Sequence, residues 1–156
     1  ILYSSMAKSI KVSIEIDAPI ARIWNEVSNI SNHIHWMHDA KSIEFLSKIK
    51  KGVGTKILVL TKVGPIKLKD VMTFTKWIEG VEIEVNHKGL VTGKGSFLLK
   101  SIDSKRTTFS WNETLKFPII LGGIVGEICG SYILKRIWKK NIRNLKKIIE
   151  YKELLT

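Results

Sequence analysis

The chain has 156 residues and a net charge of +12, from 26 lysines and arginines against 14 acidic residues. This length suits one domain with a substantial core, and the ordinary apolar and charged fractions exclude a disordered or fibrous chain. The single cysteine, Cys129, excludes an internal disulfide. We expect it to be a buried thiol in a cytoplasmic protein, because thiols stay reduced in that compartment.

The N-terminal residues are expected to lie outside the domain, which we place at residues 8–152. Residues 1–7 are interpreted as an N-terminal extension or a cloning remnant, with Met6 as the natural start. They lack the basic start and apolar run of a signal peptide. Alternating apolar residues then predict a strand over Lys8 to Asp17. Ala18-Pro19 ends this strand and begins a short helix, and a second small helix is predicted within Asn29 to Met37.

Six further strands follow, separated by turn signals such as Lys51-Gly52, Gly64-Pro65 and Glu79-Gly80. Their connections have the length of hairpin turns, which indicates antiparallel neighbours. The predicted strands are Ser42 to Ile49, Thr55 to Val63, Ile66 to Trp77, Val81 to His87, Thr92 to Ile102 and Thr107 to Phe117.

The segment from Pro118 to Tyr151 is predicted to be one long helix whose two halves differ. The later half is amphipathic at 100° per residue, with large apolar residues on one face and lysines and arginines on the other. Extended towards Pro118, the apolar face meets Gly123, Glu127, Gly130 and Ser131, which leave room that a ligand could fill. A kink at Gly122-Gly123 that realigns the two faces is the alternative.

This order of elements predicts an α+β domain in which an antiparallel sheet of about seven strands curves around the last helix. Together with "IDAPIARIWNEVSNISNHIHWM" and "LKFPIILGGIVGEICGSYILKRIWKKNIRNLKKIIE", it resembles the START and pollen-allergen (SRPBCC) superfamily and its helix-grip fold. The nearest branch is the polyketide cyclase/dehydrase and lipid-transport family. The resemblance implies the fold more than the activity, because members include carriers, hormone receptors and cyclases.

A cavity between sheet and last helix is the first candidate site. In the last strand, Phe109, Trp111 and Glu113 share the face expected to point inward, and Gly93, Gly95 and Phe97 share it in the preceding strand. Val81, Ile83, Val85 and His87 form one face of their strand. The resemblance adds Trp36 and Met37 as a lid. The predicted ligand-binding residues are Trp36, Met37, Val85, His87, Gly93, Gly95, Phe97, Phe109, Trp111, Glu113, Gly123, Glu127 and Ser131.

Glu113 and Glu127 are the candidate catalytic residues. A carboxylate in an apolar wall has a raised pKa unless it is paired, so it could orient a ligand hydroxyl or move a proton. A salt bridge, for Glu113 with a lysine at the cavity rim, is the structural alternative. The glycines likewise have a structural alternative, in sheet bending and close helix packing.

No cofactor or metal site is predicted. The spacing of His33, His35 and His38 invites a zinc interpretation, but no acidic or cysteine ligands accompany them at recognisable spacing. The lysine-rich surfaces favour anionic partners, and the protein is expected to be a monomer or a dimer. An anionic membrane, contacted through the basic face of the last helix, is preferred over nucleic acid because no nucleic-acid-binding motif is present. The run from Phe117 to Leu134 is too short, too glycine-rich and too polar at Glu127 to span a membrane.

The function predicted from these observations is binding and carriage of a small hydrophobic or amphipathic ligand, such as a lipid, an isoprenoid quinone or an aromatic metabolite. The first alternative is a cyclase/dehydrase-type enzyme that uses the cavity carboxylates. The second is an interaction module that pairs through an outer helix stripe of Leu121, Val125, Ile128 and Tyr132. Catalysis would require at least two ionisable groups within reach of one ligand atom.

Overall fold

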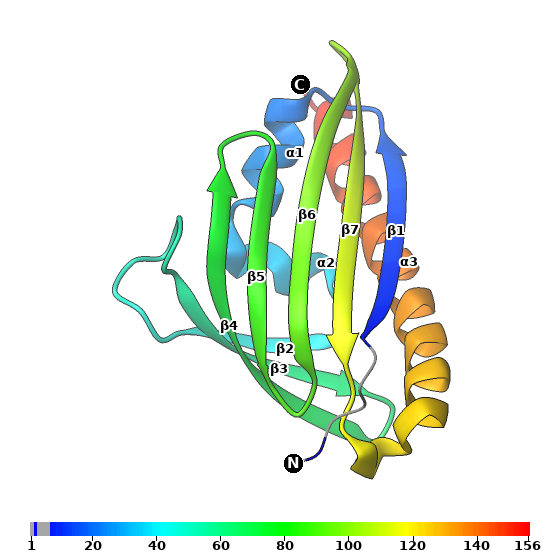
Figure 1. The fold of residues 1–156 in the computed structure, drawn as a ribbon. Coiled ribbons are helices and arrows are strands. Elements are labelled where there is room, and N and C mark those ends of the chain that lie inside the picture. Colours follow the sequence, from blue (N-terminus) through cyan, green and yellow to red (C-terminus); the bar gives the residue numbers. More distant parts are fainter. Residues whose placement is uncertain (1, 3–6) are drawn as a thin grey trace.

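The computed structural model describes residue 2 and residues 7–156, without the side chains of residues 121, 123–125 and 127. A sheet of seven antiparallel strands, in the order β1-β7-β6-β5-β4-β3-β2, curves around the helices, which all lie on one of its faces (Figure 1). The predicted helix-grip architecture is therefore confirmed. The strands are β1 (Lys8–Ile16), β2 (Ala40–Phe45), β3 (Lys56–Val63), β4 (Ile66–Ile78), β5 (Glu82–Gly89), β6 (Thr92–Asp103) and β7 (Arg106–Lys116).

The short helices connect β1 to β2 in the chain. Helix α1 (Ile20–Val27) begins directly after Pro19 and buries Ile23, Trp24 and Val27. The predicted second helix consists of two pieces, a 3-10 turn η1 (Ile30–Asn32) and the four-residue helix α2 (His33–Trp36).

The long C-terminal helix begins later than predicted. Pro118 is followed by a 3-10 turn, η2 (Ile119–Leu121), and helix α3 (Gly123–Leu154) starts only after Gly122. Gly122 has a φ of 96°, a left-handed conformation that a side chain disfavours, so the chain changes direction there. The later half of α3 packs along β1 and buries Trp138, Ile142, Leu145 and Ile149.

Aromatic rings form the centre of the core, where the sheet meets α2 and α3. Trp36 is fully buried, with its ring centroid 6.2 Å from that of Phe109 and 6.0 Å from that of Trp111. Trp111 in turn stacks on Trp138 of α3 at 4.9 Å. Edge-to-face and stacked pairs of this kind each stabilise a fold by about 1 kcal/mol beyond their burial. This cluster therefore fixes the position of α3 against the sheet.

Two expectations about burial were wrong. Cys129 is exposed, because the phase of α3 turns residue 129 away from the sheet. Val81 is 42% exposed, since β5 begins at Glu82 and residue 81 belongs to the preceding turn. Within the described residues, none of the helices is both long and apolar enough to cross a membrane.

Candidate functional site: a cavity with a buried polar cluster

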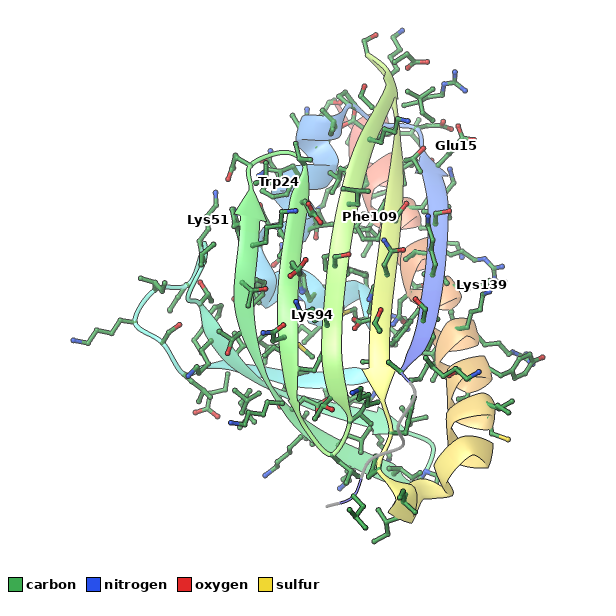
Figure 2. The ribbon with its side chains drawn as sticks, in the orientation of Figure 1. Glu15, Trp24, Lys51, Lys94, Phe109 and Lys139 are labelled. Carbon is green, nitrogen blue, oxygen red and sulfur yellow. The ribbon has the colours of Figure 1, made fainter. Side chains whose placement is uncertain are left out.

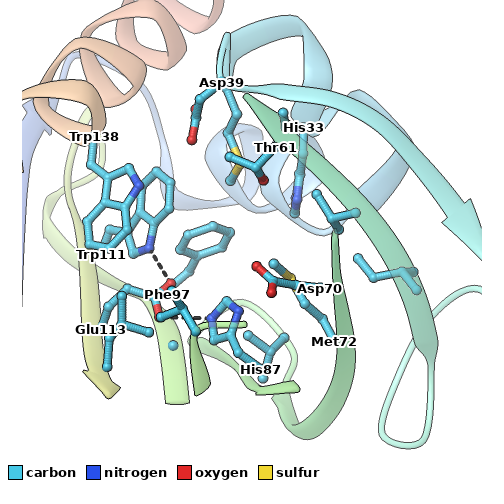
Figure 3. Close-up of a pocket in the computed structure, with 18 of the residues that line it drawn as sticks. His33, Asp39, Thr61, Asp70, Met72, His87, Phe97, Trp111, Glu113 and Trp138 are labelled. Carbon is cyan, nitrogen blue, oxygen red and sulfur yellow. Dashed lines mark hydrogen bonds and ion pairs between the residues drawn. The ribbon is translucent and has the colours of Figure 1, made fainter. Parts of the chain in front are cut away.

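An apolar cavity of about 130 Å³ lies between the concave face of the sheet and the helices. Strands β3 to β7 form most of its wall, α3 adds Leu134 and Trp138, and the segment after α2 adds Met37 and Asp39 (Figure 3). The apolar part of the wall consists mainly of Ile43, Ile57, Val59, Leu68, Met72, Phe74, Ile83, Val85, Phe97 and Leu115.

Several residues predicted to bind a ligand do line this cavity. They share the inward-facing positions of β5, β6 and β7 or lie at the end of α2. These residues are Met37, Val85, His87, Gly95, Phe97, Trp111 and Glu113. The alternation of side chains in β7 was therefore interpreted correctly, since Phe109, Trp111, Glu113 and Leu115 are all buried on one face.

Four other predicted residues lie away from the cavity wall. Trp36 and Phe109 are part of the core behind it, so Trp36 does not act as an exposed lid. A Cβ atom at Gly93 would collide with the Thr114 carbonyl oxygen, and φ at Gly93 is 147°, so this glycine permits a close approach of β6 to β7. The hydroxyl oxygen of Ser131 is buried, but Ser131 does not line the cavity.

Gly130 and Ser131 of early α3 do not line the cavity, contrary to expectation. The Cα of Gly130 lies close to Phe117, since a Cβ atom there would be 3.2 Å from the Phe117 ring. This is close helix packing, the structural alternative for that glycine. The side chains at Gly123 and Glu127 lie outside the described residues, and both positions stay predictions.

Polar groups gather at one point of the otherwise apolar wall. Glu113 is 5% exposed, and its Oε2 atom lies 2.9 Å from Nε2 of His87, whose side chain is 10% exposed. The other carboxylate oxygen of Glu113 accepts a hydrogen bond of 2.9 Å from Trp111 Nε1. The partner of Glu113 is therefore a buried histidine, and the lysine at the rim considered from the sequence was wrong.

Asp70 is the third member of this cluster, and sequence reasoning missed it. It lies on β4, is 8% exposed, and lines the same cavity. Met72 of β4 pairs with His87 of β5, which brings Asp70 to the other side of the imidazole ring (Figure 3). The signal was present in the sequence, since Asp70 interrupts an apolar alternation of Leu68, Met72 and Phe74.

Two glycines make room for the two carboxylates. Gly95 pairs with Glu113 across β6 and β7, and a Cβ atom at Gly95 would overlap both carboxylate oxygens of Glu113. Gly89 pairs with Asp70 across β4 and β5, and a Cβ atom there would overlap Asp70 Oδ1. Any larger residue at either position would have to displace a buried carboxylate, so the sheet is built around this cluster.

The cluster shifts the pKa values of its members. Burial, together with the nearby Glu113 charge, raises the pKa of Asp70 above its usual value, although the charge of His87 opposes this shift. Burial disfavours the charged form of His87, but the adjacent Glu113 and Asp70 carboxylates outweigh it and raise the pKa of His87. Asp70 and His87 therefore both have pKa values above those of free side chains.

Solved structures resemble this chain in fold at low sequence identity. The Zhui aromatase/cyclase from Streptomyces sp. R1128 superposes with a TM-score of 0.77 at 10% identity, over 92% of this chain and 94% of the other. A START superfamily protein from Mycobacterium smegmatis gives 0.69 at 14%, over 95% and 99%. The fold is therefore a START-like helix-grip fold. A conserved protein from Geobacillus kaustophilus shares the START-like fold, with a TM-score of 0.76 at 14% identity, over 92% and 96%. No family model and no curated protein matches the sequence.

The three histidines in and directly after α2 do not form a metal-binding site. His33 is buried, its Nε2 lies 2.7 Å from the Val27 carbonyl oxygen, and burial lowers its pKa to about 4, although that hydrogen bond opposes the shift. His35 and His38 are exposed. Among the described residues, no group of three or more histidine, cysteine or acidic side chains is arranged to hold a metal ion.

The end of α2 is fastened to α3 by polar contacts at the edge of the cavity. Asn141, which is 1% exposed, donates a 2.6 Å hydrogen bond to Asp39 Oδ1 and accepts one from the His38 backbone nitrogen. Asn144 donates to the Trp36 carbonyl oxygen at 3.3 Å. These contacts hold Met37 and Asp39 in the wall, so the segment after α2 is a fixed border of the cavity.

Proposed function

We propose that this protein binds and carries a small hydrophobic or amphipathic molecule in the cavity between the sheet and α3. The supporting observation is the composition of the wall, which is mainly apolar. Its polar members are the Asp70–His87–Glu113 cluster and the separate side chains of His33, Asp39, Thr61 and Ser96. Mainly apolar walls with a few convergent polar groups are typical of small-molecule sites. The START-like fold supports the same proposal, and carriage is proposed to occur in the cytoplasm.

The cavity volume favours a compact buried group. Drug-sized ligand pockets span about 300–1,000 Å³, whereas an engineered apolar cavity of about 150 Å³ binds benzene. The 130 Å³ of this cavity suits one aromatic ring or a short branched chain. Of the ligand classes considered, an aromatic metabolite or the ring of a quinone fits these dimensions better than a whole lipid, whose remainder would have to extend through the cavity mouth.

Native mass spectrometry of the purified protein, followed by solvent extraction, tests this proposal. We expect a bound species that extraction removes, or, for empty protein, uptake of added toluene. Val85→Phe would fill the cavity and should reduce toluene affinity at least about 10-fold, because the bound ring loses its contacts. Val81→Phe, at the exposed position of the preceding turn, is the matched control and should bind normally. Equal toluene binding by the two variants would place the ligand elsewhere.

An acid–base enzyme is the second candidate, and one observation favours it. Asp70, His87 and Glu113 all face one cavity, which meets the requirement for two ionisable groups within reach of one ligand atom. Such an enzyme would exchange the α-protons of a bound ketone. With cyclohexanone in D₂O, we expect exchange above the buffer rate, lowered about 10²-fold or more in Glu113→Gln. Exchange at the buffer rate for the wild-type protein would remove this candidate.

We propose an anionic membrane as a partner of the early part of α3. Ile128, Tyr132 and Ile133 are exposed there, as are Ile119 and Ile120 of the preceding turn η2. Lys135 and Lys139 follow on α3 and are also exposed, and Figure 2 shows Lys139. Exposed apolar side chains flanked by basic ones are typical of surfaces that lie on anionic lipid. A second copy of the chain is disfavoured, because a net charge of +12 would oppose self-association.

Binding to phosphatidylserine vesicles at low salt tests this partner. Lys135→Glu combined with Lys139→Glu should weaken binding by more than about 20-fold, since each lysine near the surface contributes about 1 kcal/mol. Lys94→Glu and Lys100→Glu, on exposed positions of β6, give the control. Equal loss in both double variants would show a dependence on total charge only, and equal binding to neutral vesicles would contradict the electrostatic part of the proposal.

A further inference from the structure

Among the residues that the structure describes, one buried carboxylate oxygen of the cavity wall, Asp70 Oδ1, lacks a hydrogen-bond partner. Two further buried atoms of the cluster, His87 Nε2 and Glu113 Oε2, have no partner other than each other. The last two are in ion-pair contact with each other at 2.9 Å. A buried polar group left without a hydrogen bond costs about 1–3 kcal/mol, so natural proteins keep few of them. An unpartnered carboxylate oxygen beside a buried ion pair, in an otherwise apolar wall, indicates that a ligand group completes the bonding of this cluster.

The position of this cluster is fixed by the sheet. Trp111 holds one oxygen of Glu113, and Gly95 and Gly89 leave the space that the two carboxylates occupy. The cluster members come from three strands, β4, β5 and β7, whose register is set by continuous pairing through β6. A site formed by rigid strands binds a ligand group with little reorganisation.

We propose that Asp70, His87 and Glu113 form a recognition site for a hydroxyl group of the ligand, so that the cavity selects phenols and apolar alcohols over hydrocarbons of the same shape. This inference rests on the proposed function and names the chemical class of its ligand. The apolar wall would surround the hydrocarbon part, with the hydroxyl group directed at the cluster.

The chemistry of the cluster favours a hydroxyl over other polar groups. A hydroxyl both donates and accepts hydrogen bonds, so it can donate to a carboxylate oxygen and accept from the His87 ring. An ammonium group only donates, and it would be repelled by a protonated His87. A ligand carboxylate would be repelled by Glu113, and a hydrocarbon would leave Asp70 Oδ1 unsatisfied.

The test compares p-cresol with toluene, which differ by one hydroxyl group. A purely apolar cavity binds toluene more tightly, because p-cresol loses its hydrogen bonds to water. Calorimetric titration of the wild-type protein should instead give about 10-fold tighter binding of p-cresol. In the isosteric double variant Asp70→Asn with Glu113→Gln this preference should fall to near 1, while toluene affinity stays unchanged. Thr61→Val, which removes a polar group elsewhere in the wall, should keep the wild-type preference.

Each outcome of this comparison decides a separate point. Wild-type protein that binds toluene as tightly as p-cresol overturns the hydroxyl site and leaves the proposed ligand binding intact. A preference for p-cresol that survives in the double variant also overturns it, because the hydroxyl group then binds elsewhere. If neither probe binds, the proposed function fails together with the inference. Should the double variant not fold, the wild-type preference alone decides.

Discussion

Replacement of His87 by alanine is expected to lower the free energy of unfolding by about 3 kcal/mol at neutral pH. The His87 side chain is 10% exposed and lies 2.9 Å from Glu113, which is 5% exposed. Removing one member of a buried ion pair leaves the other charge without compensation, and such losses are typically about 3–5 kcal/mol. Urea unfolding of the wild-type protein and the His87→Ala variant measures the difference.

A double-mutant cycle separates the ion pair from the packing of the ring. His87→Ala combined with Glu113→Gln should cost about 1–3 kcal/mol less than the sum of the single variants, because the single variants each leave an unpaired partner. Additive effects would show that the two groups do not interact in solution.

The contribution of His87 should also depend on pH in a defined direction. Its pKa in the folded protein is raised above 6.5, the usual value, by the facing carboxylates of Glu113 and Asp70 against the effect of burial. The resulting stability is fully present below pH 6.5 and is lost as the pH rises through the folded pKa. His87→Ala is therefore expected to destabilise the protein more at about pH 6 than at about pH 9.

His33 should give the second large effect, with the opposite dependence on pH. Burial lowers its pKa from 6.5 to about 4, so its stabilising contribution is present above pH 6.5 and is lost as the pH falls. Between these pH values only the unfolded chain takes up the proton. At about 1.4 kcal/mol per pH unit, the interval from pH 6.5 to about pH 4 lowers the free energy of unfolding by roughly 3 kcal/mol through His33.

Comparison of two glutamine variants isolates this effect from other titrating groups. His33→Gln keeps a donor for the Val27 carbonyl oxygen but cannot titrate, so its stability should fall less than that of the wild-type protein between pH 6.5 and about pH 4. His35→Gln, at an exposed position, should follow the wild-type protein. Parallel curves for wild type and His33→Gln would contradict the assignment.

The parts of the structure that local patterns determine were predicted well. Side chains alternate strictly along a strand, so the apolar residues around Glu113 were enough to place that acid in the wall. In the same way, the alternation after Lys8 predicted the first strand, and Pro19 predicted the start of the first helix.

The contacts that depend on strand register could not be predicted in the same way. Asp70 and Glu113 lie far apart in the sequence, and only the order of β4, β5, β6 and β7 brings both to His87. The role of Gly95 likewise depends on which residue of β7 it faces. The start of α3 is determined by the left-handed conformation of Gly122. Cys129 was predicted to be buried because free cysteines usually are, but it is exposed.

The most direct test of the central claim is the position of p-cresol in the complex, measured by nuclear Overhauser effects between ligand and protein protons. We expect contacts from the ligand methyl group and ring to Val85, Met72 and Ile57, with the hydroxyl end of the ring near His87. Contacts to Ile128, Tyr132 and Ile133 on the exposed side of α3 instead, with none inside the cavity, would contradict it.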